Sequence, residues 1–96
     1  MAQVKWSPLA VRELEAIYEY ISVDSELYAS NMVDRIISRA DILESHVLIG
    51  RVVPEFGKPY IRELIEGSYR IVYLVEDEDN VAIVHIHHQS RMLNIL

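Results

Sequence analysis

The sequence changes its hydrophobic period near residue 50, and this change limits the folds that it can adopt. Before that point, apolar residues recur at three- and four-residue spacing over residues 8–21 and about 26–45, which predicts two amphipathic helices. Because helical and strand-like segments fall into separate blocks, the sequence predicts an α+β fold. The strand-like block consists of short runs rich in Val, Ile and Tyr, at residues 60–66, 69–76 and 81–87.

Local signals mark where these elements begin and turn. Residues 3–6 alternate in character and predict a short strand before the first helix. Ser7 then supplies a helix N-cap, and Pro8 suits the first helical position because its missing N–H costs nothing there. The polar break at residues 22–25 is short, so the two helices should form an antiparallel hairpin. Gly67-Ser68 fits a two-residue β-hairpin turn that requires glycine first.

The elements follow one another in the order β-α-α-β-β-β. This order predicts a helical hairpin packed on a small antiparallel sheet, with residues 50–59 as a loop rich in proline and glycine. The strands at 69–75 and 81–86 are apolar on both faces, so we expect them to lie centrally under the helices. A chain of 96 residues suits a single domain over residues 1–96.

Composition narrows the classes of function. The chain has no cysteine, which excludes disulfides and thiol catalysis, and no apolar run approaches the length of a membrane span. Its start lacks a basic segment followed by an apolar one, so we expect a cytoplasmic protein. The net charge of −6 is unfavourable for binding phosphates, and only residues 49–75 are not net acidic. A local basic patch is compatible with this distribution, whereas a broad nucleic-acid-binding face is not.

The end of the last strand carries three histidines and an arginine. Alternation places His85 and His87 on one face of the strand and His88 on the other, with Arg91 following. Two histidines on one face supply too few ligands for a metal ion, so no metal site is expected. A histidine suits a general acid or base because its pKa lies near neutrality. The alternative is that these side chains are satisfied by solvent or backbone at the strand end.

Arg70 is the second candidate, because it interrupts an otherwise apolar strand. A guanidinium in such a strand must be paired or must open onto a cleft. It could form a salt bridge to Glu63 across the Gly67-Ser68 hairpin, or clamp a phosphate in a transition state, and both interpretations stand. The nearby basic residues would either extend a basic rim around it or remain solvated charges; they are Arg51, Lys58 and Arg62.

The segment Tyr69–Tyr73, followed by His88 and Arg91, completes a series of motifs spread in order over nearly the whole chain. Together they resemble the RelE/ParE superfamily of toxins from bacterial type II toxin–antitoxin systems, and ParE most closely. The resemblance implies a RelE/ParE-like fold and a toxin that is held inactive in a complex with a co-expressed antitoxin, without cofactor or metal. The earlier motifs are Val4–Pro8, Leu14–Ile21, Gly50–Phe56 and Ile61–Leu64.

Members that resemble RelE cut messenger RNA, usually in the ribosomal A site, by attack of a ribose 2′-OH on the adjacent phosphate. For a ribonuclease of this type, the resemblance implies Arg70 as the phosphate clamp and His88 as the acid, with Arg91 nearby. The position expected to hold the acidic base is occupied by Tyr60. Glu63 or Glu55 would have to substitute for that base.

Members that resemble ParE poison DNA gyrase and have no established catalytic residues. The missing base, the Gln89 that stands where an aromatic residue follows the histidine, and the acidic net charge together favour this function. A ribosome-dependent endoribonuclease is the alternative. A third possible function is that of an inactive toxin fold that acts as an antitoxin-binding co-repressor. This function is considered because a fold alone does not determine activity.

Overall fold

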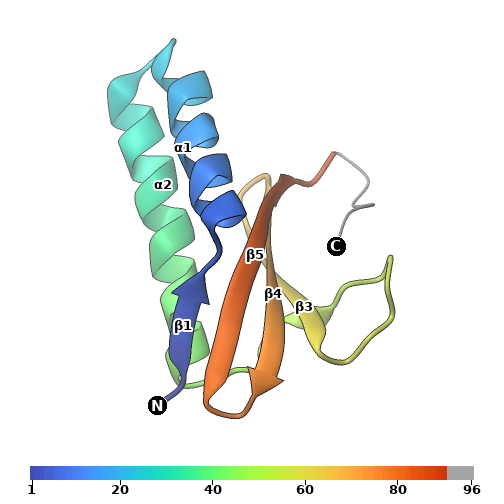
Figure 1. The fold of residues 1–96 in the computed structure, drawn as a ribbon. Coiled ribbons are helices and arrows are strands. Elements are labelled where there is room, and N and C mark those ends of the chain that lie inside the picture. The colour runs from blue at the N-terminus through green and yellow to red at the C-terminus, as the bar shows by residue number, and fades with distance from the viewer. Residues whose placement is uncertain (91–96) are drawn as a thin grey trace.

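The computed structural model describes residues 1–90 and arranges them in two layers. A helical hairpin packs against one face of a five-stranded sheet (Figure 1). This confirms the predicted α+β class. The elements are β1 (Gln3–Trp6), α1 (Pro8–Ser22), α2 (Glu26–Ala40), the 3-10 helix η1 (Asp41–Glu44), β2 (Arg51–Val52), β3 (Ile61–Glu66), β4 (Tyr69–Asp77) and β5 (Asn80–His88).

Both helices begin at serine caps. The Ser7 hydroxyl accepts a hydrogen bond from the Ala10 N–H, and the Ser25 hydroxyl accepts one from the Tyr28 N–H, both at 3.0 Å. The second helix ends at Ala40, one turn earlier than predicted, and continues as η1. The apolar pattern extends beyond the α-helix because the 3-10 turn still directs Leu43 into the core. Within residues 1–90, neither helix is long and apolar enough to cross a membrane.

The sheet has the order β1-β5-β4-β3-β2, and two of its features differ from the prediction. The sheet is mixed, because β1 pairs in parallel with β5, whereas we predicted antiparallel pairing throughout. The alternation of a short strand does not encode the direction of a partner so distant in the sequence. Residues 51–52, predicted as loop, form the short strand β2 on β3. This pairing satisfies backbone groups beside Val53, which is fully buried.

The central strand β4 is buried on both faces, as its composition predicted. On the side of the helices, which we call the helix face, Ile71 and Tyr73 join the main core with residues of α1, α2 and β5. On the other side, Val72 packs with Val53 and Ile61 beneath the segment that connects β2 to β3. We call this side the loop face. Each face of β4 is therefore covered by a different part of the chain.

A bulge in β5 determines which way its histidines point. Tyr73 pairs with Ile83 but Val72 pairs with His85, which leaves Val84 without a cross-strand partner. Directly opposed residues project from the same face of a sheet. His85 and His87 therefore share the loop face with their partners Val72 and Arg70, and His88 shares the helix face with Tyr69. The predicted division of the histidines is confirmed.

The hairpin between β3 and β4 also follows the sequence prediction. Glu66 pairs with Tyr69 across the two-residue turn, and Gly67 has a φ of +57°. No non-glycine residue among residues 1–90 has a positive φ, so Ser68 in the second turn position has an ordinary φ. This combination matches the turn type that requires glycine first.

Tyr73 ties the segment after α2 to the centre of the sheet. Its buried hydroxyl donates a hydrogen bond to the Val47 carbonyl and accepts one from the Gly50 N–H, both at 2.9 Å. A Cβ at Gly50 would come within 2.5 Å of the Glu63 carbonyl oxygen, so this close approach requires glycine. Burial raises the pKa of Tyr73, because the ionised phenolate would lose its hydration.

We expect Tyr73→Phe to lower the free energy of unfolding by about 1–3 kcal/mol, because it leaves the Gly50 N–H and the Val47 carbonyl without their partner. The measurement is urea denaturation followed by circular dichroism. The exposed tyrosine variant Tyr60→Phe is the control and should unfold like the parent protein. Equal stability of the two variants would contradict the structural role of the Tyr73 hydroxyl.

The raised pKa of Tyr73 also predicts a loss of stability in alkali. Above about pH 10 the unfolded chain releases the phenolic proton while the folded chain retains it. The free energy of unfolding should therefore fall by about 1.4 kcal/mol per pH unit until the pH reaches the folded-state pKa of Tyr73. Denaturation curves collected at successive pH values should show this slope in the parent protein and lose it in Tyr73→Phe.

Candidate functional site

Within residues 1–90, four charged residues form a cluster on the loop face. Arg70 Nε donates to Glu63 Oε1 at 2.6 Å, and its two terminal nitrogens donate to the two oxygens of Glu55 at 2.7 Å each. The second oxygen of Glu63 accepts a hydrogen bond from Arg51 Nε at 2.6 Å. The side chain of Glu63 is 0% exposed and that of Arg70 is 7% exposed, whereas that of Arg51 is 61% exposed.

The sheet register brings this cluster together. Arg51 lies opposite Glu63 on β3, and Arg70 lies opposite Ile65, one residue pair beyond it. Hydrogen bonds that Arg70 donates to the Glu55 carboxylate, and then to Glu63, raise the pKa of Arg70 against the opposing effect of burial. Arg70 therefore stays charged, but two carboxylates neutralise it. The predicted salt bridge to Glu63 is present, and Glu55 is a second partner that was not predicted.

The other predicted basic residues do not surround Arg70. Arg62 lies opposite Tyr73 on the helix face, where its guanidinium donates to backbone carbonyl groups, among them those of Pro59 and Gly50. Lys58 is exposed in the segment before β3. Only Arg51 joins the cluster, through Glu63. The loop face thus carries a set of matched charges and not a basic rim.

His88 lies in a different place, in a groove of about 440 Å³ beside α1. The groove runs between α1 and the ends of β4 and β5. β1 ends at Trp6, opposite Ile83, so it does not extend along this end of β5. Among residues 1–90, no lysine or arginine lines it. The lining residues are Glu13, Ala16, Ile17, Tyr20, Tyr69, Ile86, His87, His88 and Ser90.

The groove has capacity for acid–base chemistry. The His88 ring packs edge-on against Tyr69 with centroids 5.4 Å apart, and its Nδ1 accepts a hydrogen bond from the Ser90 N–H at 3.1 Å. In the neutral ring the proton therefore resides on Nε2, which leaves a donor for a ligand. Nε2 of His87 is buried and forms no hydrogen bond among the described residues.

Glu13 closes the exposed edge of β5 in the same region. Its Oε1 accepts a hydrogen bond from the Ile86 N–H at 3.0 Å and lies 3.4 Å from His85 Nδ1. No local signal in the sequence pointed to Glu13 or Tyr20, because they reach the groove from α1, far from the histidines along the chain. Within residues 1–90, no three histidine, aspartate or glutamate side chains gather closely enough to hold a metal ion.

The residues named for a ribonuclease site therefore separate. Arg70 and Glu63 contact each other on the loop face, whereas His88 projects from the helix face. Tyr60 is exposed in the turn just before β3, and Gln89 donates through its side chain to the Gly67 carbonyl at 2.6 Å. Arg91 lies outside the described residues.

The buried charge cluster predicts unequal effects of substitution. Glu63→Ala should lower the free energy of unfolding by about 3–5 kcal/mol, because it leaves Arg70 largely buried with one carboxylate fewer. Arg51→Ala breaks a bond to the same carboxylate from an exposed side chain and should cost less than about 1 kcal/mol. Urea denaturation of the two variants measures the difference. Similar stability losses in both would contradict a central role for the buried carboxylate.

Comparison with known proteins identifies the family. The model of the ParE toxin of the type II toxin–antitoxin system parDE matches residues 4–93. Toxin RelE2 of Caulobacter vibrioides is 38% identical over 93 residues, which cover 96% of this chain and 100% of that protein.

Solved structures share the fold at lower identity. The chromosomal ParDE toxin–antitoxin system from P. aeruginosa contains a chain with a TM-score of 0.74 and 23% identity, covering 92% of this chain and 96% of that one. The toxin–antitoxin complex RelBE2 from Mycobacterium tuberculosis gives a TM-score of 0.62 and 19% identity, with coverage of 91% and 96%. The family match and the Caulobacter relative together show that this chain belongs to the ParE toxin family of type II toxin–antitoxin systems.

Proposed function

We propose that this protein is a cytoplasmic toxin that arrests growth by poisoning DNA gyrase and is neutralised by a cognate antitoxin. The observation that supports gyrase over messenger RNA as the target is the separation of Arg70 from His88 by the sheet. RNA cleavage by attack of a 2′-OH needs a cation and an acid at the same phosphate. These two residues project from opposite faces, so they do not converge on one group.

The state of Arg70 supports the same choice. Its Nε and both terminal nitrogens already donate to carboxylates, so three of the five N–H donors of its guanidinium are committed within the protein. Releasing Arg70 to a substrate would leave Glu63 fully buried with only Arg51 as a partner, which is unfavourable for a buried charge. Poisoning of gyrase requires a binding surface and no catalytic set of residues, so it places no such demand on the cluster.

The antitoxin partner is supported by the relatives and by the surface. The solved relatives are described as toxin–antitoxin systems or complexes. In this chain, the tip of the helical hairpin exposes Tyr20, Val23 and Leu27 by 80%, 84% and 74%. Large apolar side chains exposed together are typical of a surface that a partner protein covers.

Induced expression without antitoxin tests the target directly. We expect growth arrest with induction of the SOS response while messenger RNA remains intact, and inhibition of supercoiling when purified protein is added to gyrase. An SOS reporter, transcript mapping from the same culture and a supercoiling assay measure these effects. Glu63→Ala is the control that shows whether expression of an unstable chain is itself toxic. This variant should lose its fold and with it the effect on gyrase.

Two outcomes would contradict the proposal. Codon-linked cleavage of messages without an SOS response would identify a ribonuclease, and loss of that cleavage in His88→Ala would assign the acid to the groove. Normal growth together with a tight complex with the product of a neighbouring gene would identify a binding module without toxicity.

A further inference from the structure

The outer part of the helical hairpin carries negative charge only. Residues 13–34 contain six carboxylates and no lysine or arginine; the carboxylates are Glu13, Glu15, Glu19, Asp24, Glu26 and Asp34. The net charge of the whole chain is also −6, so acidic and basic residues balance in the rest of it. In Figure 1 the hairpin extends beyond the end of the sheet, so its tip projects away from the other elements.

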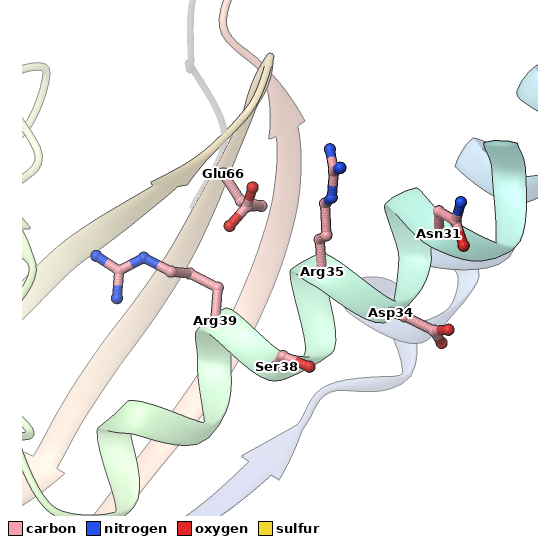
Figure 2. A pocket seen from close by; sticks show the side chains of 6 residues that line it. All are labelled: Asn31, Asp34, Arg35, Ser38, Arg39 and Glu66. Carbon is pink, nitrogen blue, oxygen red and sulfur yellow. The ribbon is translucent and has the colours of Figure 1, made fainter.

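This negative charge is not neutralised within the described part of the chain. Among residues 1–90, only Glu13 of the six has a side-chain partner, and the other five carboxylates form no hydrogen bond or ion pair. The first cations after this segment, Arg35 and Arg39, line a cleft of about 630 Å³ between α2 and the end of β3. Figure 2 shows both extending from α2, with Glu66 between them in the view and Asp34 directed away.

The acidic residues of α1 do not stabilise their own helix. Glu15 and Glu19 are four residues apart, so two like charges are neighbours on one face of α1. Glu19 also lies in the last turn, where the helix dipole favours a cation, and that turn contains no basic residue. Both arrangements are unfavourable for the isolated helix. A cationic surface placed against the tip would offset this cost.

Apolar side chains are exposed among these carboxylates. Tyr20, Val23 and Leu27, already noted for their exposure, lie in the same segment. Val23 follows Glu19 by four residues and directly precedes Asp24, so carboxylates flank it. The tip therefore combines apolar contact area with negative charge, which is the composition of an interface whose apolar centre has a charged rim.

We propose that the hairpin tip is the surface that contacts gyrase, and that it docks on an apolar pocket of gyrase bordered by lysine and arginine. This inference rests on the proposed function for the identity of the partner. An enzyme that holds DNA carries a cationic surface, because it must neutralise phosphates. Opposite charges guide the toxin to that surface, and Tyr20, Val23 and Leu27 supply the apolar contact. An antitoxin that covers these three residues would prevent the contact.

The charge of the tip disfavours other occupants. A nucleic acid would place its phosphates against a segment that has six carboxylates and no cation. A second copy of this chain, related by two-fold symmetry, would bring one acidic tip against another. A protein surface with cations around an apolar pocket meets neither repulsion.

The test measures binding of the full chain to immobilised gyrase holoenzyme by surface plasmon resonance. We expect saturable binding that weakens as salt is raised and that is about tenfold or more weaker in Glu15→Lys/Glu19→Lys, because attraction becomes repulsion. The matched control is Glu76→Lys/Glu78→Lys, which changes net charge equally at exposed residues around the β4–β5 turn, at the opposite end of the molecule from the tip. Urea denaturation should show that the Glu15/Glu19 variant is as stable as the parent, since a cation suits the last turn of α1.

A second pair of variants tests the apolar contact. Val23→Ser/Leu27→Ser should also bind gyrase about tenfold or more weakly, while the salt dependence of binding is retained. The matched control is Leu48→Ser/Ile49→Ser, which removes exposed apolar groups beyond η1, at the other end of α2, and should bind as the parent does.

Three results would overturn this inference while leaving the proposed function intact. They are equal binding of gyrase by the parent and the tip variants, equal weakening in the tip and control variants, and loss of the antitoxin complex in tip variants that still bind gyrase. The last would assign the tip to the antitoxin alone. A parent chain that does not bind gyrase would contradict the proposed function itself and this inference with it, so the two failures are distinguishable.

Discussion

The carboxylate of Glu63 has lost all contact with water and depends on protein donors for its solvation. Arg51 and Arg70 supply them, one to each oxygen, and Arg70 in turn is held by Glu55. This arrangement joins β2, β3, β4 and the segment after β2 on one face of the sheet. Because removal of Glu63 or of Glu55 leaves the largely buried Arg70 with one carboxylate fewer, the position of the loop over the sheet is linked to the state of Arg70.

The charged residues of the loop face bind one another. The two pockets described in residues 1–90 lie beside the helices instead. On one side of the hairpin, β1 ends early and exposes a groove lined by tyrosines and histidines. On the other side, α2 and the end of β3 form a cleft of about 630 Å³ that is lined by two arginines and two acidic residues. The two sites differ in chemistry, because tyrosines and histidines line the groove whereas charged side chains of both signs line the cleft.

Much of this fold could be predicted from the sequence because its signals are local. The caps at Ser7 and Ser25, the helical spacing and the Gly67-Ser68 turn each depend on residues close together in the chain. The contact between Arg70 and Glu63 could also be anticipated, since a tight hairpin fixes the register of its two strands. The parallel direction of β1 and the two-residue strand β2 could not, because each depends on a distant partner.

The candidate sites also contain some features that local sequence signals predict and others that depend on distant parts of the chain. The opposite faces of His85 and His88 follow from alternation, which is a property of one strand. The contribution of Glu55 to Arg70 comes from an irregular segment, whose path carries no periodic signal. Glu13 and Tyr20 join the histidines only because α1 crosses the end of β5, and that crossing is a property of the packed structure.

The bulge at Val84 gives β5 one more residue than the ladder with β4 requires. Ile83 and Ile86 are three residues apart, and in a regular strand they would face opposite sides, yet both lie in the main core. Deletion of the unpaired residue would restore a regular strand and leave every later side chain on its present face. This position can therefore absorb a change in chain length during evolution, so relatives that differ by one residue here can keep the same histidine orientation.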